Sequence, residues 1–482
     1  MSKILVRIES VFDISIGKLL ADNLDVGFVS PNSRFTELMK INPVEKPHHV
    51  NISDLDHRKG IMIKGESEYV EEVENVIREK LPETILFTHD VQQDAIYIAT
   101  VSKYIYKKKL AIVDIDSKNQ AIVFGIETHV GDKLIIQIKE LTNEADKLPV
   151  GSTQISLPGN YIILEPGSSF VRVSKKIHGD QRKDIFNLGK KILPEGFGII
   201  LRTSANNVGE EVIVEEINKL IALWNNVQEE FENNEEELSN RMVSGERSTD
   251  LIIDYNSKRI LDQIRQEVEP TIVDYHTFRA YSLASGFTLD FVSQFLDRFK
   301  LEEVESQLRS MITNRDFPVL NHLRVEFLYL DGTTEETIIG DITQNDPVIV
   351  TKQVLENDIH EIPGFSAMVG DIMEVHMKPG SWTIHYRFIS SETGKLLGQW
   401  LRIITPLEIT YRGKVRAFDM GMHLFKNGEP DGNITHHVDE KTRLNMKDNE
   451  TITEALDDKL AKVLQLSTEA IKNNQEQINI VL

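Results

Sequence analysis

Residues 153–205 read TQISLPGNYIILEPGSSFVRVSKKIHGDQRKDIFNLGKKILPEGFGIILRTSA and carry the most specific pattern of the chain. Short apolar runs typical of strands alternate here with Gly and Pro, which punctuate turns. Between Arg172 and Arg202 the stretch holds eight Lys or Arg and three acids, an excess of five positive charges. We therefore expect a cationic surface here, built from the basic residues at 172, 175, 176, 182, 183, 190, 191 and 202.

This basic stretch stands in a strongly acidic protein. The chain has 482 residues, with 54 Lys and Arg against 76 Asp and Glu, and its net charge is −22. Such a field repels a polyanion, so any contact with nucleic acid must come from a local basic patch. The absence of cysteine excludes disulfides, Cys-ligated metals and a thiol nucleophile. The length predicts several domains.

No membrane contact is expected from the sequence. Charged residues interrupt every apolar run among the first 15 residues, and no segment approaches the roughly 18 apolar residues of a membrane helix. We therefore expect a soluble, cytoplasmic protein without a membrane partner.

Residues 1–88 are predicted to form a small α/β unit. Its expected elements are strands at 4–10 and 60–65 and helices at 14–22 and 68–81. The second helix places its apolar residues on one face, namely Val70, Val73, Val76, Ile77 and Leu81.

Residues 89–147 change to short alternating strands with polar turns, a pattern typical of a small barrel of the OB type. Residues 91–109 carry four Lys and one Asp. Such barrels bind single-stranded nucleic acid through basic and aromatic side chains, which makes Lys103, Tyr104, Lys107 and Lys108 candidate RNA-binding residues. The pattern is equally compatible with a solvated hairpin whose lysines protect an edge.

An acidic helix is expected directly after the basic stretch. Residues 210–240 hold ten Glu and one Lys, and a run of this kind is usually the solvated face of a helix. The apolar residues Ile213, Ile217, Leu220, Ile221 and Trp224 supply the opposite, buried face.

The segments ISLPGNYIILEPG, VSKKIHGDQR, LPEGFGIILRTSA and INKLIALWNNV resemble, in order, the sensor region of the ribonuclease E/G family. The resemblance continues through TDLIIDYNSKRILDQI at 249–264, which corresponds to the strand and helix that close that family's RNase-H-like subdomain. It implies that Arg202 and Thr203 contact the terminal 5′-phosphate of RNA, with Lys175, Lys176 and Arg182 lining the approach. A guanidinium offers a planar two-donor fork to phosphate oxygens.

Two features depart from that family. Its Asp-rich catalytic subdomain, where two carboxylates hold Mg²⁺, is missing downstream. The two barrel positions that carry aromatic rings in the family correspond here to Ile112 and Ile122.

Residues 311–482 are predicted to form an antiparallel β-barrel with a closing helix, whose start is indicated by a Thr451-x-x-Glu454 capping box. The combination with the preceding region resembles the archaeal FAU family of AU-rich RNA-binding proteins, whose C-terminal domain is related to nucleotide phosphatases. The resemblance makes Asp419 and Asp439 the candidate catalytic and Mg²⁺-binding residues, although His423 replaces the second acid of the phosphatase motif. We interpret the six histidines between His360 and His437 as scattered surface residues.

The sequence thus predicts an α+β multidomain protein with a small α/β unit at 1–88, an OB-type barrel at 89–147, a ribonuclease E/G-like region at 148–310 and a phosphatase-like β-barrel at 311–482. The function predicted from the resemblance is an endoribonuclease that processes or degrades ribosomal RNA precursors and binds AU-rich loops. Mg²⁺ is the expected cofactor, and no organic cofactor is expected. Two alternatives stay open: a non-catalytic RNA-binding module, and an Mg²⁺-dependent nucleotide phosphohydrolase.

Overall fold

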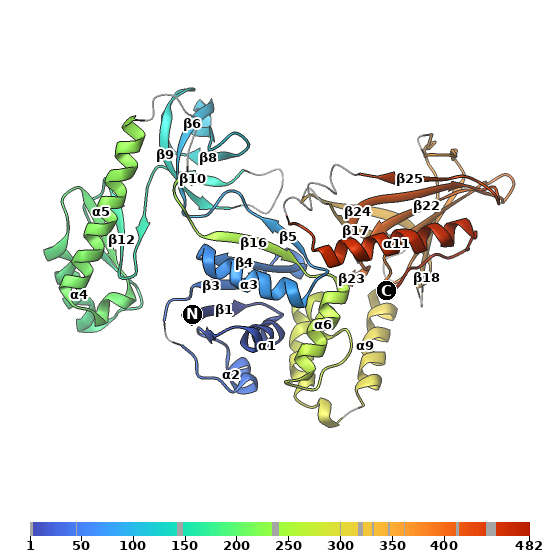
Figure 1. Cartoon of the computed structure of the whole chain (residues 1–482), viewed down its shortest axis with the longest axis horizontal. Helices are drawn as coiled ribbons and strands as arrows, with labels where there is room; N and C mark the ends of the chain where they lie inside the picture. The colour runs from blue at the N-terminus through green and yellow to red at the C-terminus, as the bar shows by residue number, and fades with distance from the viewer. Residues whose placement is uncertain are drawn as a thin grey trace. The chain divides into compact units, whose positions relative to one another are not determined.

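The computed structural model describes residues 3–44, 46–141, 148–233, 241–298, 300–316, 322–329, 332–345, 348–360, 362–410, 414–439 and 450–482. The chain divides into two compact units (Figure 1). Unit 1 comprises Met1–Thr88 and Ser248–Leu482, and unit 2 comprises His89–Arg247. Among the described residues, no helix has the length and apolar character needed to cross a membrane. The fold is mixed α+β and multidomain, as predicted.

The first part of unit 1 is a six-stranded sheet in the order β2-β1-β3-β4-β16-β5. Its strands are β1 (Ile4–Glu9), β2 (Val26–Phe28), β3 (Val50–Asp54), β4 (Gly60–Gly65), β5 (Ile85–Thr88) and β16 (Arg247–Ile252). Its helices are α1 (Asp13–Asn23), α2 (Ser33–Met39), α3 (Ser67–Lys80) and α6 (Tyr255–Gln266), with η1 (Asp56–Arg58) in the β3–β4 connection. β16 comes from far along the chain but pairs antiparallel with β5, Thr249 opposite Thr88.

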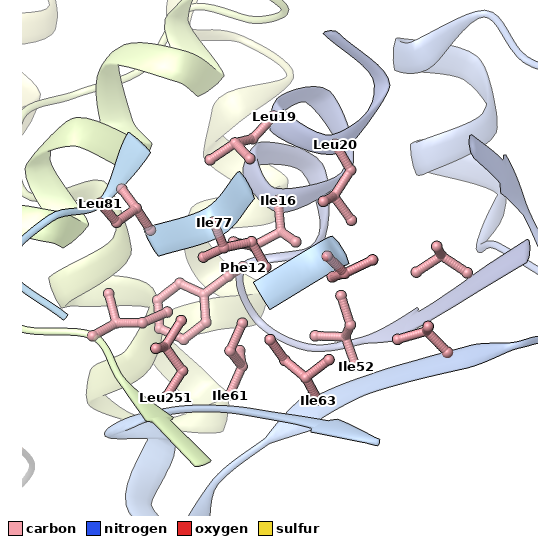
Figure 2. Close-up of a cluster of buried hydrophobic side chains, with 14 of the residues drawn as sticks. Phe12, Ile16, Leu19, Leu20, Ile52, Ile61, Ile63, Ile77, Leu81 and Leu251 are labelled. Carbon is pink, nitrogen blue, oxygen red and sulfur yellow. The ribbon is translucent and has the colours of Figure 1, made fainter. Parts of the chain in front are cut away.

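A core of aliphatic side chains and Phe12 joins the sheet to its helices (Figure 2). The predicted helical face of α3 contributes Val70, Val73 and Ile77, all fully buried. Leu251 of β16 belongs to the same core, so residues before and after unit 2 build one hydrophobic cluster. Burial of such side chains stabilises by about 1.5–3 kcal/mol each.

Three helices follow the sheet and precede the large barrel: α7 (Tyr275–Tyr281), α8 (Leu283–Ser293) and α9 (Leu301–Asp316), with the short turn η4 (Leu296–Arg298) between the last two. They are held by a small separate core that contains Ile272, Tyr275, Phe278 and Leu289.

The rest of unit 1 is a predominantly antiparallel β ring that is closed by the parallel pairing of β17 with β24. Its strands are β17 (His322–Leu328), β18 (Thr334–Asn345), β19 (Ile349–Val354), β20 (Ile372–Met377), β21 (Thr383–Ile389), β22 (Leu396–Ile404), β23 (Glu408–Thr410), β24 (Lys414–Asn427) and β25 (Ile434–Val438). Helix α11 (Glu454–Lys472) packs its apolar face against the ring, and Leu456, Leu460 and Val463 are buried there.

Unit 2 begins with a small closed barrel. β6 (Ile96–Ile105), η2 (Tyr106–Lys108), β7 (Leu110–Asp114), β8 (Gln120–Phe124), β9 (Lys133–Glu140) and β10 (Val150–Ser152) follow in the chain. β6 pairs with both β7 and β9, which closes the ring, and β15 (Arg241–Val243) adds to β6 from outside. The strands predicted within residues 89–147 correspond to β6, β7, β8 and β9.

The remainder of unit 2 is a four-stranded sheet in the order β11-β12-β14-β13. Its elements are β11 (Leu157–Pro158), β12 (Ile162–Pro166), β13 (Val171–Val173), α4 (Gly179–Ile192), β14 (Phe197–Leu201), η3 (Thr203–Asn207) and α5 (Glu210–Asn233). β13, α4 and β14 form a parallel β-α-β unit, and Val173 lies opposite Leu201.

Candidate nucleic-acid interface

The ends of the two parallel strands β13 and β14 bring the predicted RNA-binding residues together. The Ser174 N–H donates to the Leu201 carbonyl at 2.8 Å, and the hydroxyls of Ser174 and Thr203 lie 3.0 Å apart. Because parallel strands end at the same edge, the segment with Lys175 and Lys176 lies beside Arg202 and Thr203. The structure therefore unites residues that are almost 30 positions apart.

Arg182 joins this edge from the first turn of α4. Its Nη1 donates to the Ser174 carbonyl at 2.7 Å and to the Ile177 carbonyl at 3.2 Å, which fixes the loop before the helix. The N-cap residue His178 makes no side-chain capping hydrogen bond. The first backbone N–H groups of α4 therefore have neither an intrahelical acceptor nor a side-chain cap, and such a helix start favours anions.

Four of the eight basic residues between Arg172 and Arg202 are engaged by other side chains and are not available to bind a phosphate. Lys183 pairs with Asp180 at 3.2 Å and Lys191 with Glu210 at 2.7 Å. Arg172 and Lys190 lie over the rings of Phe170 and Phe186. Within the described parts of the chain, the four remaining cations have no carboxylate within 4.0 Å, and they are Lys175, Lys176, Arg182 and Arg202. The uniform cationic surface expected from the sequence is thus reduced to one cluster.

Glu216 of α5 fixes the loop beside this cluster. The acidic composition of 210–240 did not indicate such a role. Its carboxylate accepts hydrogen bonds from the N–H groups of Asn160, Tyr161 and Ile162, at 2.6, 2.8 and 3.1 Å. Arg202 in turn donates from Nη1 to the Gly159 carbonyl at 2.7 Å. A Cβ on Gly159 would lie 2.6 Å from the Glu216 carboxyl carbon, so a larger residue there would displace this carboxylate.

The barrel presents the second predicted set of RNA-binding residues. Lys103, Lys107 and Lys108 are exposed on β6 and η2. The Tyr104 hydroxyl donates to the Ile126 carbonyl at 2.9 Å, and its ring contacts that of Tyr106 edge-on at 4.6 Å. Tyr106 is 73 % exposed and is therefore the tyrosine whose face is available to a base. Whether these residues bind RNA stays a prediction.

The two isoleucines at the family's aromatic positions face each other across β7 and β8. Ile112 pairs with Ile122, and Lys103 pairs with Ile112 from the other side. Phe124, two residues beyond Ile122 on the same face, is 56 % exposed. Its exposure was not evident from the sequence, but the two-residue alternation of β8 would have found it.

The C-terminal candidates Asp419 and Asp439 do not form a metal site with each other. Arg402 donates from both Nε and Nη2 to Asp419 Oδ2, and Gly421 N donates to Oδ1 at 2.9 Å. Asp439 is exposed just after β25. Since both Asp419 oxygens are engaged and Arg402 neutralises the charge, the pair does not fit Mg²⁺, which needs several free oxygen ligands. No three His, Asp or Glu among the described residues converge as a metal centre.

The surface interpretation of the six histidines is wrong for His376 and His385, which are 3 % and 0 % exposed. His423 is also largely covered, because Trp400 Nε1 donates to its Nδ1 at 3.0 Å. Burial lowers the pKa of all three imidazoles. The polar character of these histidines suggested that they face solvent. In a closed ring, however, alternate residues of each strand point inward whatever their type.

A Ser-His-Asp chain also occurs in unit 1. His276 Nδ1 lies 2.6 Å from Asp262 Oδ1, and its Nε2 lies 3.0 Å from Ser15 Oγ. The Ser15 hydroxyl donates to the Leu261 carbonyl, and with the hydroxyl so placed His276 Nε2 is the donor to Ser15 Oγ. All three side chains are buried, and the chain of hydrogen bonds links α1 to α6 and α7 as a structural element.

Comparison with known proteins gives this geometry a context. Residues 156–315 match the sequence model of the ribonuclease E/G family. A Thermococcus kodakarensis protein described as probable ribonuclease FAU-1 is 24 % identical over 444 residues, which covers 89 % of this chain and 90 % of that protein. The corresponding Pyrococcus horikoshii protein is 25 % identical over 459 residues, which covers 89 % and 91 %.

Among solved structures, FomD in complex with CDP matches 32 % of this chain and 85 % of its own, with 12 % identity and a TM-score of 0.24. The sequence matches confirm both predicted resemblances. The chain is a homologue of probable FAU-1 ribonucleases over 89 % of its length.

Proposed function

We propose that this homologue of probable FAU-1 ribonucleases binds RNA through unit 2 and recognises a 5′-monophosphate with the cluster around Arg202. The observation that carries the proposal is the junction of β13 and β14, where Ser174 meets Thr203 and four unpaired cations adjoin the start of α4. Charge-assisted hydrogen bonds from guanidinium to phosphate are among the strongest that a protein offers.

The barrel would bind the single strand that follows the 5′ end. Exposed Lys103, Lys107 and Lys108 attract the backbone, and the open rings of Tyr106 and Phe124 offer stacking surfaces to bases. The proposed substrates are ribosomal RNA precursors, bound at AU-rich loops, and the proposed reaction is endonucleolytic cleavage in the cytoplasm.

The decisive experiment compares matched RNAs. Arg202→Ala should weaken binding of a 5′-monophosphorylated oligomer by about tenfold, the worth of a charge-assisted hydrogen bond, and leave its 5′-hydroxyl counterpart nearly unchanged. Lys183→Ala is the control, because Lys183 lies in the same stretch but pairs with Asp180. Equal losses on both RNAs in Arg202→Ala would refute the sensor role.

Cleavage needs its own test. Pure protein is incubated with labelled precursor ribosomal RNA with and without EDTA, since Mg²⁺ is the proposed cofactor. Asp419→Asn is assayed in parallel. Normal cleavage by this variant places the reaction away from Asp419, in keeping with the pairing of Asp419 with Arg402.

A further inference from the structure

A cavity of about 1030 Å³ lies within unit 1, away from the residues assigned above. The β3–β4 connection, helices α6 to α8 and strands β17, β18, β23 and β24 of the ring form its walls. Its volume is at the upper end of the range that ligand pockets span, and a nucleotide or one residue of a polynucleotide fits within it.

The walls of this cavity carry more positive than negative charge. Three acids line it, Glu326, Glu336 and Glu408, together with five cations: Arg58, Lys258, Arg324, Lys414 and Arg416. This leaves an excess of two positive charges in a protein whose net charge is −22.

The ion pairs show where that excess lies. Arg416 pairs with Glu326, and Lys258 pairs with Glu408. Lys414 and Arg324 share the single charge of Glu336. Arg58 has no described carboxylate within 4.0 Å, and its Nη1 reaches only the Ala280 carbonyl, at 3.5 Å. Arg58 is therefore not in an ion pair with a described carboxylate, although its charge acts on the nearby Asp54 carboxyl, and Arg324 is only partly neutralised.

Two neutral features of the cavity wall would favour an anion. Thr277 is 6 % exposed and lines the cavity, yet its hydroxyl has no hydrogen-bond partner. A buried polar group without a partner is destabilising, so such groups are rare. Ser282, Leu283 and Ala284 also line the cavity, and they are the N-cap and first residues of α8. A capping box occupies the Ser285 N–H with the Ser282 hydroxyl, so the first-turn donors left for a ligand are the N–H groups of Leu283 and Ala284. First-turn N–H groups favour an anion.

The backbone beside Arg58 is strained. His57 and Arg58 have φ values of +54° and +50°, a left-handed conformation that side chains other than Gly, Asn and Asp rarely adopt. Arg416 supports this turn by donating to the His57 carbonyl at 3.4 Å. Strain of this kind persists only where the surrounding structure fixes the residue, and it is enriched at ligand-binding sites.

We propose that this cavity is a phosphate-binding site. Arg58 and Arg324 supply guanidinium forks, the Thr277 hydroxyl donates to a phosphate oxygen, and the α8 N-terminus adds backbone donors. The phosphate belongs either to an internal phosphodiester of RNA, in which case the site rests on the proposed function, or to a free nucleotide.

Two variants test the site in the full-length chain. Arg58→Asn removes the guanidinium and keeps a residue that tolerates positive φ. Thr277→Val removes only the unpartnered hydroxyl, so the thermal midpoint should not fall. Arg7→Gln is the control, because the Arg7 side chain is 40 % exposed, pairs with Glu9 and lies outside the cavity. The probes are a 5′-hydroxyl RNA oligomer, UTP and inorganic phosphate, measured by calorimetry.

We expect Arg58→Asn to weaken either the RNA or the UTP by about tenfold, and Thr277→Val to weaken the same probe by a smaller factor. Loss on 5′-hydroxyl RNA, with the 5′-phosphate preference retained, identifies RNA as the source of the phosphate. Loss on UTP and phosphate alone identifies a free nucleotide, even if the chain does not bind RNA. Unchanged affinities for all probes in both variants overturn the proposal.

Discussion

Acidification should destabilise the C-terminal ring through one buried imidazole. The N–H of Ile478 donates to His385 Nδ1 at 3.3 Å, so Nδ1 carries no proton. His385 Nε2 lies 2.8 Å from Gln399 Oε1 and must donate to it. This neutral tautomer connects the C-terminal segment to β21 and β22, and a second proton on the ring would remove the acceptor for Ile478.

The size of the effect follows from the pKa. Burial, with a smaller contribution from His376, lowers the pKa of His385 to about 3, from 6.5 in an unfolded chain. Below pH 6.5 the unfolded state therefore binds a proton at His385 that the folded state does not bind. The contribution of this residue to the unfolding free energy is complete above pH 6.5 and is lost as the pH falls towards 3. Between pH 7.5 and pH 5 the linkage relation gives a loss of about 2 kcal/mol, and a folded pKa one unit higher leaves that figure unchanged.

The assay is urea denaturation at pH 7.5 and pH 5 in a Trp224→Phe background, where the fluorescence comes from Trp382 and Trp400 of the ring. His385→Asn keeps an oxygen acceptor near the position of Nδ1 and cannot titrate. Its loss of unfolding free energy on acidification should be smaller than that of the parent by about 2 kcal/mol. Identical losses in both proteins would falsify the assignment of the effect to His385.

Three further predictions concern buried contacts. Glu408→Gln should lower the unfolding free energy by about 3–5 kcal/mol, because it leaves the Lys258 ammonium unpaired and fully buried. Urea denaturation measures this loss, and a value below about 1 kcal/mol would contradict the prediction. Gly60→Ala should disrupt β16, since its Cβ would lie 2.0 Å from the Leu251 carbonyl oxygen; unchanged amide exchange in β16 would argue against this. Glu216→Gln should reduce the preference for 5′-phosphorylated RNA by about threefold or more, because three N–H groups lose a charged acceptor. Glu215→Gln, the exposed neighbour that pairs with Lys219, should not, and equal effects of the two variants would count against a positioning role.

Local sequence patterns identified the elements whose residues interact with near neighbours. The 3.6-residue period of 68–81 corresponds to α3, and the alternation in 96–140 corresponds to four barrel strands. The predicted capping box is two residues early, because the N-cap of α11 is Thr453 rather than Thr451. Thr451 instead accepts a hydrogen bond from Leu86 N beside β5, so tertiary pairing decides where the helix begins.

The candidate interface was predictable only where one segment carries it. Arg202 and Thr203 follow from a contiguous motif, but the support from Glu216 arises because α5 packs against β12, which no periodicity within either element reveals. The Arg402–Asp419 pair is similar: the two residues lie 17 positions apart, and the antiparallel pairing of β22 with β24 brings them together.

Unit 2 is inserted in the sequence between two strands of the first sheet of unit 1, and the structure shows how this sheet can still form. β5 and β16 pair in register, Thr88 with Thr249, so the roughly 160 residues between them form one loop of the sheet. Closing a flexible loop of that length costs about 4–5 kcal/mol by the logarithmic relation.

Unit 2 reduces this cost because its own hydrogen bonds hold its ends together. Glu246 N donates to the Gln93 carbonyl at 2.9 Å, and Gly245 N donates to Gln92 Oε1 at 3.0 Å. Gly245 has to be glycine for this, since a Cβ there would lie 2.0 Å from the Gln93 carbonyl oxygen. The sheet therefore closes around a unit whose ends already meet, so the proposed RNA-binding unit can retain its own fold without weakening the core shown in Figure 2.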